Sequence, residues 1–268
     1  MTTSFPTALD QQPSRVPEVT ADFWLIKLLA VTMGETAADF LNVNLGYGLT
    51  ATSLLMAGIF LVALAIQFYQ GKYVPWSYWL TVVLISVVGT LVTDNLVDNF
   101  GVSLMTTTIG FTIALAATFA IWYGVEGTLS IHSIHTPRRE GFYWLAILFT
   151  FALGTSVGDQ VSEQFDLGYL NTGLLFGGII ALISLAYYKF KLDAITAFWL
   201  AYILTRPLGA SFGDLLSQPM EYGGLGLGTI TTSIGFMIAI IATVIYASWR
   251  YSRSHSAANL RQDATGSP

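Results

Sequence analysis

Four aspartates recur at matched positions in stretches that otherwise carry little charge. Asp39, Asp94, Asp159 and Asp214 each follow a glycine by five residues, and each glycine follows a tryptophan by ten. Carboxylate oxygens suit hard cations such as Mg²⁺, Ca²⁺ and Mn²⁺, as well as Na⁺ and protons. Each aspartate could instead cap a helix end or turn, because Asp near a turn often bonds backbone groups. Four of them at one depth favour a functional carboxylate cluster.

Two further ionisable side chains accompany the aspartates. Glu35 lies four residues before Asp39 and therefore shares its face of a helix. Arg206 stands in an apolar stretch three residues before Gly209 and is followed by Pro207, which would loosen the helix there. A buried guanidinium needs a partner, and these carboxylates can supply one. We expect Arg206 to take the place of a cation when the site is empty.

Hydroxyl side chains occupy similar levels in every copy of the pattern. Helix capping and close packing account for many of them, and the others would add oxygen ligands to the cluster. These hydroxyls belong to Thr32, Thr36, Thr90, Thr93, Thr155, Ser156, Thr205 and Ser211.

The elements that carry these residues are four copies of one unit. Each copy begins with an aromatic residue followed by Trp-Leu, at residues 23, 78, 143 and 198. The aspartates are 55, 65 and 55 residues apart, so the chain divides into two halves of two copies each. Fixed spacing of this kind is typical of internal repeats.

Composition indicates a membrane protein. Hydrophobic residues make up 54% of the chain and charged residues 10%, with a mean hydropathy of +0.63; an ordinary soluble domain has roughly 25% charged residues. The apolar runs are about 20 residues long, enough to cross a hydrocarbon layer about 30 Å thick. The chain has no cysteine, which excludes disulfides and thiolate metal ligands.

The pattern predicts an all-α polytopic membrane bundle of eight transmembrane helices. Each repeat is expected to be a helical hairpin: a Trp-to-Asp helix, a tight glycine-containing turn and a second apolar helix. The expected spans are about 22–41, 49–69, 76–97, 103–123, 142–161, 170–188, 197–216 and 228–249.

We expect a membrane domain over residues 21–249, between a disordered N-terminal tail (1–20) and a disordered C-terminal tail (250–268). The repeats cover about 21–72, 73–126, 140–191 and 194–249. Because each repeat has an even number of spans, all four enter the membrane in the same direction and are related by rotation about the membrane normal. The four Asp-bearing helices would then surround a common axis, with the second helices outside.

Basic residues predict the orientation. Nine of the eleven Lys and Arg lie in the loops between repeats or in the tails, and none lies in the turns within repeats. The positive-inside rule therefore places both termini in the cytoplasm. The four repeated tryptophans are expected at the cytoplasmic headgroup level. The nine residues are Arg15, Lys72, Arg138, Arg139, Lys189, Lys191, Arg250, Arg253 and Arg261.

The repeated glycines predict close helix packing. Small residues four apart let helix backbones approach each other in lipid. Two repeats have a GxxxG pair, and the other two have glycine followed by alanine or threonine at the same spacing. The expected packing residues are Gly34, Gly89, Gly154, Gly158, Gly209 and Gly213.

Other functional classes fit poorly. The spans contain no histidine or cysteine and none of the aspartate contexts of intramembrane aspartyl proteases, so we do not expect an enzyme. No cofactor and no nucleic-acid partner are expected. His132 and His135 fall in a cytoplasmic loop, away from the aspartates. Because Arg206 occurs once rather than four times, a closed cavity is favoured over an open four-fold pore.

The sequence resembles a bacterial family of repeat-containing integral membrane proteins labelled "membrane-anchored protein". The resemblance covers about residues 16–249, from Val16-Pro17-Glu18-Val19-Thr20 to Arg206-Pro207-Leu208-Gly209-Ala210-Ser211-Phe212-Gly213-Asp214. It implies a location in the bacterial cytoplasmic membrane and supplies no substrate.

Two hypotheses of different classes follow. The first is a transporter for a small cation, with a divalent metal such as Mn²⁺ as a candidate and protons as the exchanged ion. Asp39, Asp94, Asp159 and Asp214 would bind the cation. The second is a non-transporting membrane scaffold or accessory subunit, in which the carboxylates hold helices together. The lipid bilayer is a partner in both.

Overall fold

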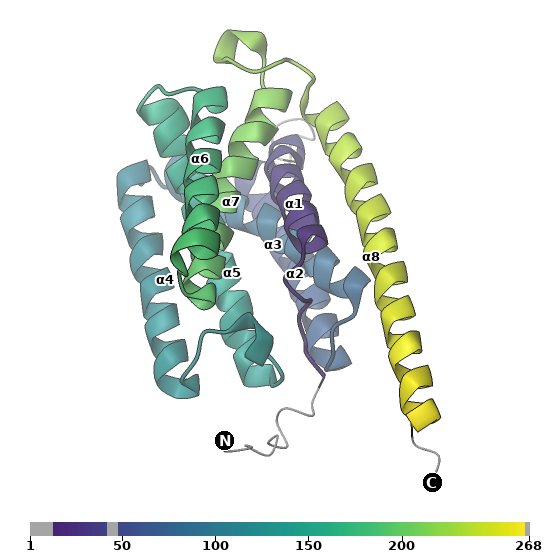
Figure 1. Cartoon of the computed structure of the whole chain (residues 1–268). Helices are drawn as coiled ribbons and strands as arrows, with labels where there is room; N and C mark the ends of the chain where they lie inside the picture. Colours follow the sequence, from purple (N-terminus) through teal and green to yellow (C-terminus); the bar gives the residue numbers. More distant parts are fainter. Residues whose placement is uncertain (1–12, 42–47, 266–268) are drawn as a thin grey trace.

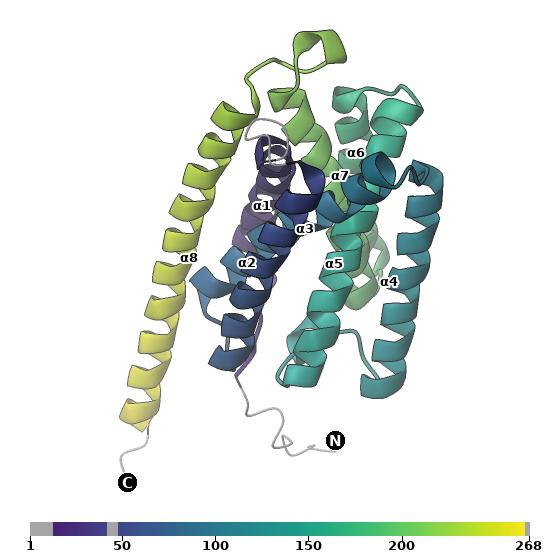
Figure 2. The same ribbon diagram turned by 180° about the vertical axis from the view of Figure 1, so that it is seen from behind.

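A computed structural model describes residues 13–41 and 48–265, with side chains described as far as residue 253. Within that part of the chain, eight α-helices form an inner and an outer layer (Figure 1; Figure 2). This is the all-α bundle that the sequence predicts. The helices are α1 (Ala21–Asp39), α2 (Leu49–Gln70), α3 (Pro75–Asp94), α4 (Leu104–Glu126), α5 (Pro137–Asp159), α6 (Tyr169–Phe190), α7 (Ala194–Ser217) and α8 (Thr229–Thr265).

The inner layer is a closed ring made by the first helix of each repeat. α1 packs against α3, α3 against α5, α5 against α7, and α7 against α1. Aromatic side chains at the start of these helices make the same contact at all four junctions: the first aromatic residue of one repeat touches the tryptophan of the next. Ring centroids are 5.6 Å apart for Phe23–Trp79, 5.5 Å for Tyr78–Trp144, 6.3 Å for Tyr143–Trp199 and 5.7 Å for Phe198–Trp24. The repeats are therefore arranged by rotation about one axis.

This ring of aromatics corrects the predicted role of the tryptophans. Trp79, Trp144 and Trp199 are buried inside the bundle, and Trp24 is half-buried, so they do not form a belt at the headgroups. Trp199 Nε1 donates a hydrogen bond to the carbonyl of Leu129 at 2.9 Å. Aromatic pairs gain from edge-to-face contact beyond the area they bury. Packing between repeats thus outweighs the preference of indole rings for the membrane interface.

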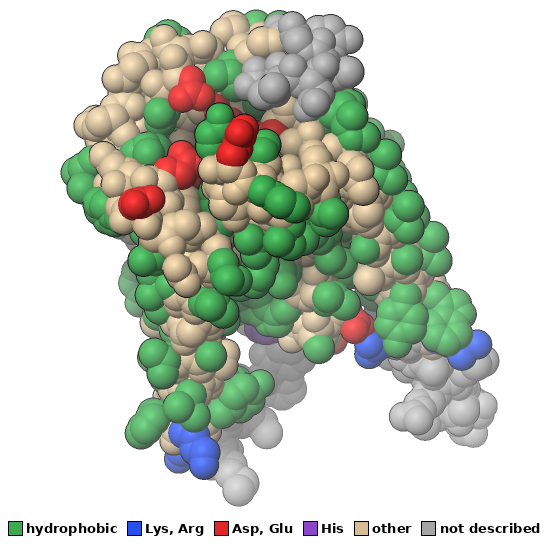
Figure 3. All heavy atoms as spheres, turned by 90° about the horizontal axis from the view of Figure 1, so that it is seen from above, with side chains coloured by type: hydrophobic (Ala, Val, Ile, Leu, Met, Phe, Trp, Pro, Cys, Tyr) green, Lys and Arg blue, Asp and Glu red, His purple; other side chains and the backbone are tan. Residues whose placement is uncertain are grey.

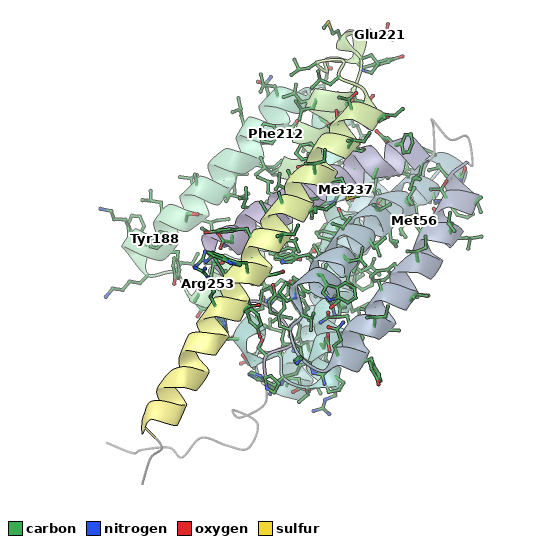
Figure 4. All side chains as sticks on the ribbon, turned by 90° about the vertical axis from the view of Figure 1, so that its right-hand side faces the viewer. Met56, Tyr188, Phe212, Glu221, Met237 and Arg253 are labelled. Carbon is green, nitrogen blue, oxygen red and sulfur yellow. The ribbon has the colours of Figure 1, made fainter. Side chains whose placement is uncertain are left out.

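The outer layer is displaced by one repeat relative to the inner layer. α2 packs mainly on α3, α4 on α5, α6 on α7, and α8 closes the circle on α1. The principal partner of each outer helix is therefore the inner helix of the following repeat. Figure 4 looks onto α8, with Glu221 beyond its start and Arg253 toward its far end.

Six helical segments of the described chain are long and apolar enough to cross a membrane, and they include every helix except α1 and α7. α1 and α7 carry buried ionisable side chains, among them Glu35 and Arg206, and they complete the inner ring with α3 and α5. The protein is thus a multi-pass membrane protein, and the two helices outside this set both belong to the inner ring. The segments are Leu49–Gln70, Pro75–Asn99, Leu104–Glu126, Pro137–Gln164, Tyr169–Phe190 and Thr229–Arg253.

Charge separates the two ends of the bundle. We call the end that carries the four aspartates the acidic end, and the opposite end, where the inner helices begin, the basic end. In Figure 3, acidic side chains gather over the end that faces the viewer, and the visible basic side chains lie toward the other end. The turns at the acidic end use glycines with positive φ, such as Gly48 (+76°) and Gly168 (+72°), a conformation that L side chains rarely adopt.

Three segments differ from the sequence prediction. Residues 1–12 lie outside the described part of the predicted N-terminal tail, but residues 13–20 pack against the bundle, where Val16 is buried. α5 begins at Pro137, with Thr136 as its N-cap, which shortens the predicted loop around His132. α8 continues to Thr265, beyond the predicted end of the last span. The predicted turn after α1 falls on residues 42–47, outside the described residues.

Candidate functional site

The inner helices end where the repeated aspartates stand. α1, α3 and α5 end at Asp39, Asp94 and Asp159, whereas Asp214 lies one turn before the end of α7. A π-helical turn follows directly after Asp94 and Asp159. Such turns are rare and often occur at functional sites. Repeat geometry therefore brings four carboxylates to one end of the axis.

Three carboxylates converge most closely. One oxygen from each of Glu35, Asp159 and Asp214 lies within 4.8 Å of the other two. Asp214 is 8% exposed, and Asp159 is half-buried. Among the described residues, no side chain donates a hydrogen bond to Asp159 or Asp214. The three acids come from three different repeats, so the ring itself assembles this cluster.

The other two predicted acids lie beside this cluster. Asp39 accepts a hydrogen bond from Gln218 Nε2 on its Oδ2 at 3.1 Å. Asp94 is outside the close group, although Glu35 and Asp159 are near enough to repel its charge. The four aspartates are therefore not equivalent. Glu35, which occurs in one repeat only, is closer to the centre of the cluster than Asp94 is.

Arg206 lies directly beside the cluster, at the centre of the ring. Its side chain is 0% exposed, and its Nη2 donates to Glu35 Oε2 at 2.7 Å, to Thr155 Oγ1 at 2.9 Å and to Thr90 Oγ1. Its Nη1 donates to the carbonyl of Val31 at 3.4 Å. Glu35, Thr90 and Thr155 occupy the same repeat position, twelve residues after the first aromatic residue. The guanidinium thus bonds one side chain from each of the three other repeats.

The repeated glycines make room for this arrangement. A Cβ atom on Gly89 would lie 2.7 Å from Phe151 Cβ, and one on Gly209 would lie 2.7 Å from Val31 Cγ1. A Cβ atom on Gly34 would likewise come too close to Ser86, and one on Gly154 would come too close to the Arg206 side chain. Each glycine faces the residue eight positions after the first aromatic of the next repeat.

The second glycine of each GxxxG pair is less crowded. A Cβ on Gly213 would lie 3.1 Å from the carbonyl oxygen of Thr32, and one on Gly158 would lie 3.6 Å from Pro207. α7 runs without a break through Pro207, although the sequence predicts a loosened helix there. The pairs thus bring helix backbones together on both sides of α7.

Lys27 is a buried ionisable residue that the sequence prediction did not single out. It is completely buried, donates from Nζ to the carbonyl of Tyr202 at 2.9 Å and to Thr205 Oγ1, and lies 3.8 Å from the centre of the Tyr202 ring. No carboxylate pairs with it among the described residues. The sequence could have indicated it, because Lys27 is an ionisable residue inside the first predicted span, three residues after Trp24.

Between Arg206 and the basic end, side chains fill the centre of the inner ring. Lys27 and Arg206 both approach the ring of Phe151, at 5.6 Å and 6.0 Å from its centre. Toward the basic end, the hydroxyls of Tyr78 and Tyr143 are 2.5 Å apart and both side chains are buried. The acidic cluster therefore faces one end of the bundle, with side chains closing the route to the other.

Two other features lie away from the cluster. His132 and His135 are in the segment before α5, at the basic end, as their position in the sequence predicts. A cavity of about 550 Å³ lies between α1, α6 and α7, where Trp24, Ile180 and Phe198 are among its mainly apolar lining residues. None of the predicted ion-binding residues lines this cavity.

The metal ligands that the cluster of Glu35, Asp159 and Asp214 offers are all oxygen atoms, and the guanidinium of Arg206 lies beside them. With all three carboxylates ionised, they and one guanidinium would carry a net charge of about −2, which a divalent cation would neutralise. Carboxylate and hydroxyl oxygens are the ligands that Mg²⁺, Ca²⁺ and Mn²⁺ accept, whereas soft metals prefer sulfur. The arrangement can attract and hold a small hard cation.

Comparison with known proteins agrees with the repeat structure. No curated protein and no solved structure matches the chain. A family model described as "Repeat of Unknown Function (DUF347)" matches four times, at residues 23–73, 77–128, 142–193 and 197–253. These matches cover most of the chain, and each contains one inner and one outer helix. The chain belongs to the DUF347 repeat family.

Proposed function

We propose that the protein transports a small cation across a membrane, and that a divalent metal such as Mn²⁺ is its substrate. The observation that carries this proposal is the convergence of Glu35, Asp159 and Asp214 within 4.8 Å, next to a fully buried Arg206. Carboxylates within a membrane are costly and usually serve a substrate path. Three of them from separate repeats are arranged to share one ion.

Arg206 supports a transporter rather than a channel. Its guanidinium is at the centre of the ring and pairs with Glu35 at 2.7 Å, where a cation on the axis would have to pass. A cation that enters the cluster competes with Arg206 for Glu35. Binding and release can therefore be linked to movement of Arg206, and protons that neutralise the carboxylates would favour release. Exchange of the metal for protons follows as the simplest coupling.

Sidedness is part of the proposal. The basic end carries Lys72, Arg138 and Arg139, and the positive-inside rule assigns that end to the cytoplasm. Both termini would then be cytoplasmic, in a bacterial inner membrane, and the acidic end would face outward. In this orientation the cluster is accessible from outside while the cytoplasmic end is closed.

Metal content of cells tests the proposal. Cells that express the wild type at a known membrane level should differ in Mn²⁺ content from cells that lack it, and Asp159→Asn should abolish the difference. Asp166→Asn is the matched control, because Asp166 is an exposed acid at the same end whose positive φ of 56° asparagine tolerates. The amount of folded protein is measured for both variants by size-exclusion chromatography.

Two outcomes would count against transport. If the wild type changes the content of no metal, the carboxylates serve another purpose. If Asp159→Asn chiefly lowers the amount of folded protein, the alternative gains support: a membrane scaffold or accessory subunit in which these acids hold helices together.

A further inference from the structure

A second Arg–Glu pair, in which the glutamate is buried and the arginine half-buried, lies at the basic end, far from the acidic cluster. Arg15 Nη1 donates to Glu140 Oε2 at 2.7 Å, and Glu140 is 0% exposed. Arg15 also donates to two backbone carbonyls, from Nε to His135 at 3.2 Å and from Nη1 to Phe68 at 3.5 Å. The guanidinium is therefore surrounded by oxygen atoms, as Arg206 is beside Glu35.

The rest of the Glu140 side chain is held in place by the bundle. Its Oε1 accepts hydrogen bonds from Gln67 Nε2 at 3.2 Å and from Trp144 Nε1 at 3.4 Å. Gln67 Oε1 in turn accepts from Ser77 Oγ at 2.8 Å. These donors come from α2, α3 and α5, so the carboxylate would stay oriented if Arg15 were to leave. No repeat other than the third has an acid at this position.

Arg15 belongs to a segment without regular secondary structure. We call residues 13–19 the strap. The strap crosses the basic end and is bound by three backbone contacts: Tyr73 N to Ser14 O at 2.8 Å, Arg15 N to Ile134 O at 3.0 Å, and Gln67 Nε2 to Arg15 O at 3.2 Å. Its contacts reach the loop before α3, the loop before α5 and the end of α2. It therefore lies across the end of α2 and the segments that precede α3 and α5, at the basic end.

The two Arg–Glu pairs differ in how the arginine is attached. Arg206 is in the middle of α7, whereas Arg15 is on a strap that a few hydrogen bonds and two buried residues, Val16 and Pro17, hold in place. Segments with few contacts open at lower free energy than packed helices do. Of these two guanidinium groups, that of Arg15 is thus the one that can leave without breaking a helix.

We propose that Glu140, with the carbonyls of Phe68 and His135, forms a second cation-binding site that Arg15 now fills as a tethered plug. Release of the strap uncovers Glu140 at the basic end and lets the transported cation take the place of the guanidinium. This inference rests on the proposed transport function and assigns its cytoplasmic exit. A protein with the acidic cluster open and the strap in place is the outward-facing form.

Cysteine labelling tests the plug without any metal. The chain has no native cysteine, so one introduced thiol is unique. Ser77 is 2% exposed and bonds Gln67, whose amide in turn binds the Arg15 carbonyl of the strap, and Ser77→Cys places a side chain of similar size there. We expect this thiol to react with a maleimide in permeabilised membranes at least about tenfold faster when Arg15→Gln is added, a factor that corresponds to about 1.4 kcal/mol.

Three controls separate opening from unfolding. His132→Cys, at an exposed position, should react quickly in both backgrounds. Thr150→Cys, which is buried in the middle of α5, should stay unreactive in both. Arg139→Gln removes an arginine at the same end that pairs with Glu126 at 2.6 Å, and should leave Ser77→Cys protected.

Each labelling outcome supports or contradicts the proposal that Arg15 acts as a plug. Protection of Ser77→Cys that does not depend on Arg15 would overturn the proposal. So would simultaneous exposure of Thr150→Cys, because the strap would then be an anchor for the whole bundle. None of these results depends on transport, so a failure of the proposed function and a failure of the plug can be told apart.

Metal binding tests the second site. In a background where Asp214→Asn weakens the acidic cluster, Arg15→Gln should gain stabilisation by Mn²⁺ in a thermal unfolding assay on the purified full-length chain. Adding Glu140→Gln should remove that gain. No cation site exists at Glu140 if Mn²⁺ stabilises the Arg15→Gln variant to the same degree with and without Glu140→Gln. The same conclusion follows if Mn²⁺ stabilises neither variant.

Discussion

Replacing Arg206 by glutamine tests whether this residue occupies the place of a bound cation. The guanidinium is completely buried and its Nη2 is 2.7 Å from Glu35 Oε2. Coulomb's law with an effective dielectric constant of about 20 gives an attraction of roughly 6 kcal/mol at this distance. Breaking a buried ion pair from one side typically costs about 3–5 kcal/mol, because the remaining charge is left without a partner.

This loss should be visible in a thermal unfolding assay. A destabilisation of about 3–5 kcal/mol corresponds to a fall in melting temperature of roughly 6–20 °C for a chain of this size. Mn²⁺ should recover part of the fall in Arg206→Gln, because the metal can take the place of the guanidinium beside Glu35. At a concentration one hundred times its Kd, a ligand stabilises the folded state by about 2.7 kcal/mol. The expected recovery is therefore between about half and about nine-tenths of the loss.

Glu35→Gln is the matched variant, because it breaks the same pair from the other side. It leaves the guanidinium buried and removes one metal ligand, so its melting temperature should fall by a similar amount and Mn²⁺ should recover much less of it. If Mn²⁺ restored the melting temperature equally in the two variants, the idea that Arg206 and the metal occupy the same place would be refuted. Absence of any response to Mn²⁺, Mg²⁺ or Ca²⁺ would refute a divalent-cation site.

Three further predictions concern packing, the unpaired lysine and the cluster. Gly89→Ala should cost about 1–3 kcal/mol, because its Cβ would meet a side-chain carbon of α5 at 2.7 Å; Gly110→Ala, with open space around it, should be neutral, as denaturant unfolding can show. Lys27→Met should leave the melting temperature unchanged or raise it, since a buried charge without a carboxylate partner adds little stability, but it should alter metal accumulation if Lys27 serves transport. Asp214→Asn should abolish stabilisation by Mn²⁺ measured by calorimetry, whereas Glu221→Gln, at an exposed position of the same end, should retain it.

The sequence predicts the fold well because the repeat places strong local signals at fixed intervals. Tryptophan, glycine and aspartate define each inner helix, and mean hydropathy defines each outer helix. Even the close approach at Gly89 follows from a small residue within an apolar helix. The displacement of the outer layer by one repeat does not follow from these signals, because a hairpin that packs on itself and one that packs on its neighbour have the same pattern.

The candidate site could be predicted only in part. The aspartates and Arg206 are visible in the sequence because ionisable residues are rare in apolar spans. The partners of Arg206 are not visible, because Thr90 and Thr155 look like ordinary packing hydroxyls until the ring brings them to the axis. Arg15 and Glu140 are 125 residues apart, and neither stands in an apolar run that would make it conspicuous. Long-range pairing of this kind depends on the arrangement of the helices in space.

Departure from the repeat is what distinguishes this axis from a symmetric pore. Four glutamates at the level of Glu35 would place like charges together in a buried layer, at a large cost in free energy. The chain has instead one acid, two threonines and an alanine at that level, and the position one turn earlier supplies a single arginine. An open cation channel would need the arginine elsewhere, because its guanidinium fills the centre of the ring. A closed site needs a positive group that neutralises the acid when the substrate is absent, and Arg206 meets that requirement with hydrogen bonds to all three other repeats.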